Sequence, residues 1–181
     1  MKMMFLSDIH GSIFWLKQAM DQFEHEDADQ LILLGDLLYH GPRNPLPEHY
    51  DTQAVAALLN RYKQKIIAVR GNCDAEVDQF MFEFPMMADY SVLLHEGRKI
   101  FLTHGHIFDV DHLPNVSAGD VFVQGHTHIP VAEKRGDIFF FNPGSLALPK
   151  NNHPHSYGIL KNHELQIKDL DGTVITSLAL H

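Results

Sequence analysis

The chain has 181 residues, of which 45% are hydrophobic and 20% charged, and this is enough to bury a sizeable core. Its formal net charge is −9, and no basic block interrupts the sequence. This balance argues against an extended nucleic-acid surface, because phosphate backbones are held mainly by clustered cations. A small phosphorylated substrate remains compatible with it, since bound metal ions make one pocket locally positive.

The cellular location is indicated by the N-terminus and by cysteine usage. Only four apolar residues, Met3 to Leu6, precede the polar Ser7, whereas a membrane-spanning helix needs about 20. A secretory signal peptide also needs a longer apolar segment. Cys73 is the single cysteine, so an internal disulfide is impossible. We therefore expect a cytoplasmic protein without membrane segments.

The first half of the chain alternates between strand and helix patterns. Short apolar runs predict strands at residues 3–7, 31–34 and 66–69. One helix is expected after the cap Ser12, and a second after Asp51 or Thr52, each with apolar residues at helical spacing. A proline-rich loop at residues 40–50 precedes the second helix. This alternation predicts a parallel sheet with helical cover.

The second half of the chain is rich in strand and turn signals. The turn signals are Glu96-Gly97, Arg135-Gly136-Asp137 and Asp171-Gly172. The strands are expected at residues 90–94, 99–103, 121–124, 131–134, 138–141, 157–160, 165–170 and 173–178. We predict an α/β fold with two facing mixed β-sheets flanked by helices, which makes a four-layer sandwich. No linker or repeat divides it, so residues 1–181 are expected to form a single domain.

Potential metal ligands follow five of the predicted strands. Any one of them alone is more often an ordinary turn residue, but five such accidents in a row are implausible. In sheets that contain parallel strands, ligands gather beyond the carboxyl ends of the strands. Seven oxygen or nitrogen ligands suit two divalent cations, and two cations suit attack on a phosphoryl group. The seven residues are Asp8, His10, Asp36, Asn72, His104, His126 and His128.

The order of these motifs resembles the calcineurin-like metallophosphoesterase superfamily, in particular its compact phosphodiesterase branch. The resemblance covers residues 3 to about 145. Its motifs are Asp8-Ile9-His10, Gly35-Asp36, Gly71-Asn72-Cys73-Asp74, His104-Gly105 and Gly125-His126-Thr127-His128.

The resemblance implies two metal sites that share one carboxylate. The first metal would be held by Asp8, His10, Asp36 and His128. The second would be held by Asp36, Asn72, His104 and His126. Mixed nitrogen and oxygen ligands suit several divalent ions. Among these we favour manganese, with nickel, zinc and iron as alternatives.

The implied reaction is hydrolysis of a phosphodiester by a hydroxide that the two metals activate. A small phosphodiester substrate is therefore expected. Two alternatives stay open. The first is a phosphomonoesterase of the same superfamily. The second is a non-catalytic, metal-binding interaction scaffold of the retromer-subunit type, since intact ligands do not guarantee turnover.

Cys73 departs from the family pattern, because many relatives carry at this position a histidine that is thought to protonate the leaving group. A thiol is a poor replacement for an imidazolium as proton donor. His106 and His40 are the candidate substitutes, although a supporting place in the pocket wall is favoured for each. Asp74 could orient a metal ligand by hydrogen bonding.

Two further predictions concern the substrate and the oligomer. Arg43 and Asn72 are candidate substrate-binding residues, although Arg43 could equally be a solvated loop residue. The apolar stretch from Phe80 to Met87 is either core under a loop or a subunit contact, and core is favoured. A homo-oligomer therefore stays possible. The physiological substrate is not indicated by any motif.

Overall fold

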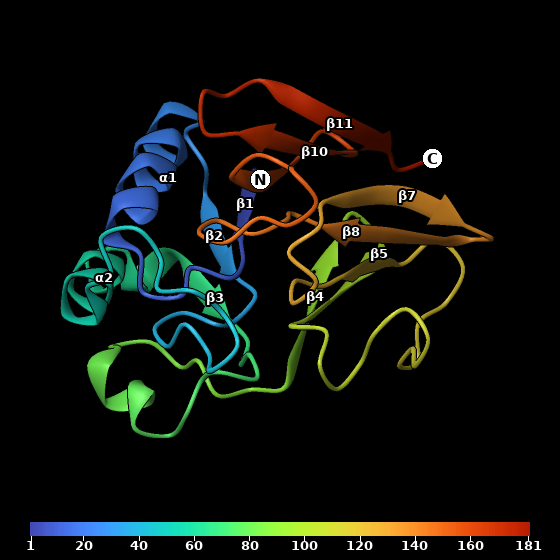
Figure 1. Ribbon diagram of the computed structural model, residues 1–181. Coiled ribbons are helices and arrows are strands. Elements are labelled where there is room, and N and C mark those ends of the chain that lie inside the picture. The colour runs from blue at the N-terminus through green and yellow to red at the C-terminus, as the bar shows by residue number, and fades with distance from the viewer.

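The computed structural model describes residues 1–181 and contains two β-sheets that pack face to face (Figure 1). The first sheet has six strands in the order β11-β10-β9-β1-β2-β3. Its β1, β2 and β3 are parallel to one another, whereas β9, β10 and β11 add to it in antiparallel fashion. The bounds are β1 (Met3–Leu6), β2 (Gln30–Leu33), β3 (Ile66–Ala68), β9 (Ser156–Lys161), β10 (Glu164–Asp169) and β11 (Val174–Ala179).

The second sheet has five strands in the order β4-β5-β6-β8-β7. Its three central strands β5, β6 and β8 are parallel, and the edge strands β4 and β7 are antiparallel to their neighbours. Both sheets are therefore mixed, as predicted. The bounds are β4 (Tyr90–His95), β5 (Arg98–Thr103), β6 (Val121–Val123), β7 (Val131–Arg135) and β8 (Ile138–Asn142).

Two α-helices, α1 (Ile13–His25) and α2 (Thr52–Asn60), pack on the outer face of the six-stranded sheet (Figure 1). The side chain of Ser12 accepts from the backbone N–H of Trp15 and caps α1, and Asp51 caps α2 in the same way through Ala54. Two short 3₁₀ helices, η1 (Lys63–Lys65) and η2 (Asp78–Met81), complete the helical structure. No helix has the length and apolar character needed to span a membrane.

The core is divided into layers by the alternation of side chains along the strands. In β1, Met3 and Phe5 pack between the two sheets, while Met4 and Leu6 pack against the helices. All four are fully buried. A strand that is buried on both faces reads as a continuous apolar run, and the sequence shows such a run here.

The outer face of the five-stranded sheet lacks the helical layer that the sequence interpretation expected. Phe101, Phe122 and Phe140 form a small cluster there. The segment between β5 and β6 covers it, with Phe108 and Val110 packed against the rings (yellow in Figure 1). This segment contains turns and no helix. The two facing sheets are thus confirmed, whereas helices flank only one of them.

Candidate metal centre

The structure brings all seven predicted ligands to one edge of the two sheets. Each follows the carboxyl end of a strand that has parallel neighbours. Asp8 and His10 follow β1, and Asp36 follows β2. Asn72 follows β3, His104 follows β5, and the pair His126 and His128 follows β6.

Three of the four imidazoles in this set are held in the same orientation by backbone carbonyl groups. Nδ1 of His10 lies 2.8 Å from the carbonyl oxygen of Tyr39, and Nδ1 of His104 lies 2.7 Å from that of Leu34. Nδ1 of His128 is likewise 2.5 Å from a carbonyl oxygen. A carbonyl only accepts, so each Nδ1 carries the hydrogen and donates it. In the neutral rings, Nε2 then presents a lone pair to the site, which is the arrangement of a metal-binding histidine.

Two of these ring nitrogens converge on Asp8. Nε2 of His128 lies 3.1 Å from Oδ1 of Asp8, and Nε2 of His10 lies 3.7 Å from the same oxygen. The two Nε2 atoms are 3.4 Å apart. Oδ1 is buried without a hydrogen-bond partner, whereas Oδ2 accepts from the Ser7 hydroxyl and from the backbone N–H of His126. An unpaired carboxylate oxygen that faces two lone pairs fits a divalent cation.

A second group of ligands meets at Asp36. Its Oδ2 lies 3.4 Å from Nε2 of His104 and 3.7 Å from Nε2 of His10. Nε2 of His104 is also 3.1 Å from Oδ1 of Asn72 and 3.2 Å from Nδ1 of His126. One oxygen of Asp36 is therefore close to a histidine from each predicted group. This is the position that a bridging carboxylate requires.

The electrostatics of the site show how tightly the carboxylates and imidazoles interact. Burial alone would raise the pKa of Asp8, but the His128 and His104 imidazoles hold it well below its usual range. Burial would lower the pKa of His104, but Asp36 and Asp8 raise it to about 9. In the metal-free protein, the raised pKa of His104 favours a proton on this ring, which supplies positive charge beside the two carboxylates.

The raised pKa of His104 predicts how the stability of the chelator-treated protein depends on pH. A histidine whose folded pKa is raised stabilises the fold fully below about pH 6.5, and this contribution is lost as the pH rises through the folded pKa. We expect His104 to make the unfolding free energy fall by about 2 kcal/mol between pH 6.5 and 9. Urea unfolding at several pH values measures this. His104→Gln is the control and should flatten the slope, and a flat wild-type profile would contradict the prediction.

The backbone at the site adopts a conformation that side chains rarely tolerate. Five of the seven ligands have a positive φ, between 46° and 66°. Such a residue costs about 1–3 kcal/mol unless its surroundings hold it in place. The gathering of five such residues at one edge of the sheets is consistent with a functional site there. The five residues are Asp8, His10, Asp36, His126 and His128.

Two glycines allow the ligand loops to approach one another closely. A Cβ on Gly71 would lie 2.1 Å from Oδ1 of Asp36, and a Cβ on Gly125 would lie 1.8 Å from the Ser7 hydroxyl oxygen. Neither glycine has a positive φ, so their role is close packing rather than turn formation. In the sequence, both glycines are recognisable only as parts of the ligand motifs. Only the fold shows what packs against them.

Gly71→Ala is therefore expected to displace the Asp36 carboxylate. We expect the unfolding free energy to fall by about 2 kcal/mol and bound metal to be lost, because the clash involves backbone as well as side chain. Urea unfolding and elemental analysis measure the two effects. Gly97→Ala is the matched control, since a Cβ there meets no atom within 4 Å and only backbone strain is added. Equal effects of the two variants would contradict the steric explanation.

Asp74 contacts the loops that carry the candidate ligands and does not line the cavity beside them. Its buried carboxylate accepts from the backbone N–H groups of Asp36, Leu37 and Gly71, at 2.7–2.9 Å. Burial and the Asp36 charge raise its pKa, and the three N–H donors counteract part of this shift. These contacts fit the predicted role of orienting a ligand.

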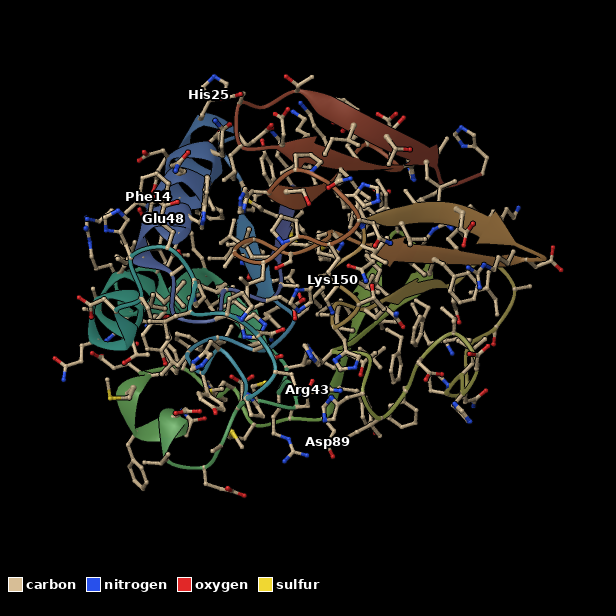
Figure 2. All side chains as sticks on the ribbon, in the orientation of Figure 1. Phe14, His25, Arg43, Glu48, Asp89 and Lys150 are labelled. Carbon is tan, nitrogen blue, oxygen red and sulfur yellow. The ribbon has the colours of Figure 1, made fainter.

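A cavity of about 340 Å³ opens above the ligands. Its lining is almost entirely polar and includes Asp36, Asn72, His126 and His128. Two cationic side chains, Arg43 and Lys150, also line it, and Figure 2 shows both near the centre of the molecule. Arg43 was predicted at this place. Lys150 was missed because it belongs to no motif and follows Asp36 by more than a hundred residues.

The predicted proton donors His106 and His40 do not line this cavity. The His106 ring lies 5.4 Å from the His104 ring, and burial together with the His104 charge lowers its pKa to about 4. The His40 ring packs edge-on against Tyr39 and Tyr50. The structure thus gives neither residue contact with the space above the ligands, and their catalytic role stays a prediction.

Cys73 does line the cavity. Its backbone N–H donates to Oδ1 of Asp36 at 2.8 Å, and its thiol lies close enough to His10 and Asp36 to join a metal-binding group with them. Burial and the Asp36 charge raise the pKa of the thiol to about 12. The thiol therefore keeps its proton at neutral pH in the metal-free protein.

Comparison with known proteins agrees with this geometry. Residues 1–164 match the model of the calcineurin-like phosphoesterase superfamily domain. The chain is 50% identical to phosphodiesterase YfcE of Escherichia coli K12, over 100% of this chain and 99% of that protein. It is 30% identical to the probable metallophosphoesterase YsnB of Bacillus subtilis, over 88% of this chain and 83% of the relative.

A solved structure of the E. coli phosphoesterase Yfce superposes with a TM-score of 0.98 at 49% identity, with 100% of both chains covered. The sequence match and the shared fold point to the same conclusion, and the cluster of carboxylates and imidazoles is consistent with it. The chain belongs to the calcineurin-like phosphoesterase superfamily.

Proposed function

We propose that this protein is a metal-dependent phosphodiesterase with a binuclear centre. The observation that carries the proposal is the convergence of lone pairs at two carboxylates, with Oδ2 of Asp36 close to both His10 and His104. The 50% identity to a phosphodiesterase over the full chain supports the same reaction class. We expect manganese as the native ion, with nickel, zinc or iron as alternatives.

The residues fit two cations in the following way. Asp8, through its unpaired oxygen, and the two histidines beside this oxygen would hold one ion, together with Asp36. Asp36 would also hold the second ion, together with three further ligands. The first set is Asp8, His10 and His128, and the second is Asn72, His104 and His126. When bound, divalent cations supply water activation and charge neutralisation at phosphorus.

The other residues of the cavity bind and orient the substrate. Arg43 and Lys150 are the two cationic side chains that line it, and they can hold the anionic diester against the ligand cluster. Asn72 offers its amide at the same cavity. With a net charge of −9 on the whole chain, this local positive charge selects a small anion rather than an extended nucleic acid.

Metal removal and readdition tests the proposal. The chelated protein should lose hydrolysis of bis(p-nitrophenyl) phosphate, and individual divalent ions should restore it, with manganese the most effective. Activity that survives complete chelation would contradict the two-metal mechanism. Faster hydrolysis of p-nitrophenyl phosphate than of the diester would favour the phosphomonoesterase alternative. Metal binding without turnover of either substrate would favour the interaction scaffold.

We also propose a cytoplasmic location, which the single unpaired cysteine supports. The oligomeric state is open because the apolar stretch from Phe80 to Met87 could be either core or a subunit contact. In this stretch Phe82, Phe84 and Met86 are buried in the core, as favoured, whereas Phe80 is 90% exposed. The core prediction therefore applies to part of the stretch only.

A further inference from the structure

A second cavity, of about 430 Å³, adjoins the metal centre. Most of its lining is apolar, in contrast to the polar cavity above the ligands. Both volumes lie in the range of small-molecule sites. We call this second space the apolar cavity, and the residues that define it here are Leu38, Tyr39, Tyr50, Cys73, Val77 and Met81.

The two cavities share Cys73, which lines both of them. The wall of the apolar cavity is also fixed to the metal centre, because the carbonyl oxygen of Tyr39 accepts from Nδ1 of His10 at 2.8 Å. A molecule whose phosphate lies above the ligands can therefore extend past Cys73 into the apolar cavity.

The chemistry of the apolar cavity favours an uncharged occupant. Asp78 is the only acidic residue in its lining, and no Lys, Arg or His lines it. A second anionic group would thus be repelled. Val77 is 67% exposed and Met81 is 37% exposed, so their apolar surface is available for contact. Tyr39 and Tyr50 add aromatic surface to the lining.

We propose that the apolar cavity is a subsite for one uncharged apolar or aromatic ester group of the phosphodiester substrate. This inference rests on the proposed function. It defines the substrate class as diesters that join a phosphate to at least one apolar group. The phosphate lies at the metal centre, the apolar group lies against Val77 and Met81, and Cys73 lies at the boundary between them.

Symmetric dialkyl phosphates test the subsite, since either of their ester groups can enter it. We expect the inhibition constant to fall from dimethyl to diethyl to dibutyl phosphate, by about two- to fourfold for each methylene that becomes buried. In the double variant Val77→Ser/Met81→Ser, the ratio of the inhibition constants of dimethyl and dibutyl phosphate should be at least fivefold smaller than in the wild type. The control is Val92→Ser/Leu94→Ser on β4, which exposes similar apolar surface elsewhere and should behave like the wild type.

A second measurement does not depend on turnover. Cys73 is the single cysteine, so alkylation at about pH 9, where a small thiolate fraction forms despite the raised pKa, reports on the boundary of the two cavities alone when it is followed by mass spectrometry. Dibutyl phosphate should slow this alkylation at lower concentration than dimethyl phosphate, even if the protein hydrolyses no diester. A failure of the proposed function is thereby distinguished from a failure of the subsite.

Three results would overturn the inference. The first is inhibition that is independent of chain length, and the second is chain-length dependence that persists in Val77→Ser/Met81→Ser. The third concerns a second copy of this chain as the occupant. If sedimentation shows an oligomer that Val77→Ser/Met81→Ser dissociates, while protection of Cys73 is independent of chain length, then the apolar cavity serves subunit contact.

Discussion

Asp36→Asn is expected to reduce phosphodiester hydrolysis by about 10³-fold or more. Oδ2 of Asp36 lies within 3.7 Å of Nε2 of both His10 and His104, so it is the carboxylate oxygen placed between the two ligand groups. An amide has nearly the same shape but carries no charge with which to hold two cations. The fold should persist, because the amide oxygen can still accept from the backbone N–H of Cys73.

Elemental analysis and kinetics check this result together. The variant should bind fewer metal ions per chain, and its residual activity should not recover fully at high metal concentration. Asp120→Asn is the matched control, since Asp120 is also a buried carboxylate that accepts from backbone N–H groups, here of Lys99 and Ser117. It lies at the opposite end of β6 and should change stability without changing metal content. Full activity in Asp36→Asn would refute the bridging role.

The sequence predicted the strands, and the meeting of the polar residues that follow them, because both depend on local patterns. Apolar runs such as Met3–Leu6 are buried on both faces, and each polar ligand comes directly after such a run. The carboxyl ends of parallel strands meet at one edge of a sheet, so predicted strands are enough to bring the ligands together. The caps Ser12 and Asp51 are local signals too, and both are found in the structure.

Other features depend on contacts that sequence spacing does not encode. His106 and His40 lie two and four residues from predicted ligands, yet the spacing does not determine where their rings point. Lys150 reaches the cavity from the loop before β9, far from every motif. The close approach of Gly71 to Asp36 requires two loops from different strands. The segment that covers the five-stranded sheet contains no helix, and its position also depends on tertiary packing rather than on sequence spacing.

The second large effect concerns the leaving group of the substrate. No imidazole is available at position 73, and the pKa of the Cys73 thiol is raised to about 12, so the thiol releases its proton poorly at neutral pH. General acid catalysis contributes about 10²–10⁴-fold to a rate. We therefore expect hydrolysis of aryl diesters to depend steeply on leaving-group pKa, with alkoxide leaving groups slower than p-nitrophenolate by nearly their full intrinsic difference.

A Brønsted plot across substituted phenyl diesters, under conditions where chemistry limits the rate, measures this dependence. Cys73→His should restore a donor and raise the rate by about tenfold or more for the poorest leaving groups, while p-nitrophenyl diesters change little. Cys73→Ala controls for the altered volume and should keep the steep slope.

Lys150→Met tests whether another cation of the cavity protonates the leaving group. A slope that becomes steeper in this variant would identify Lys150 as a donor. A shallow slope in both the wild type and Lys150→Met would mean that leaving-group protonation is not limiting, and the substitution at position 73 would then have no catalytic cost.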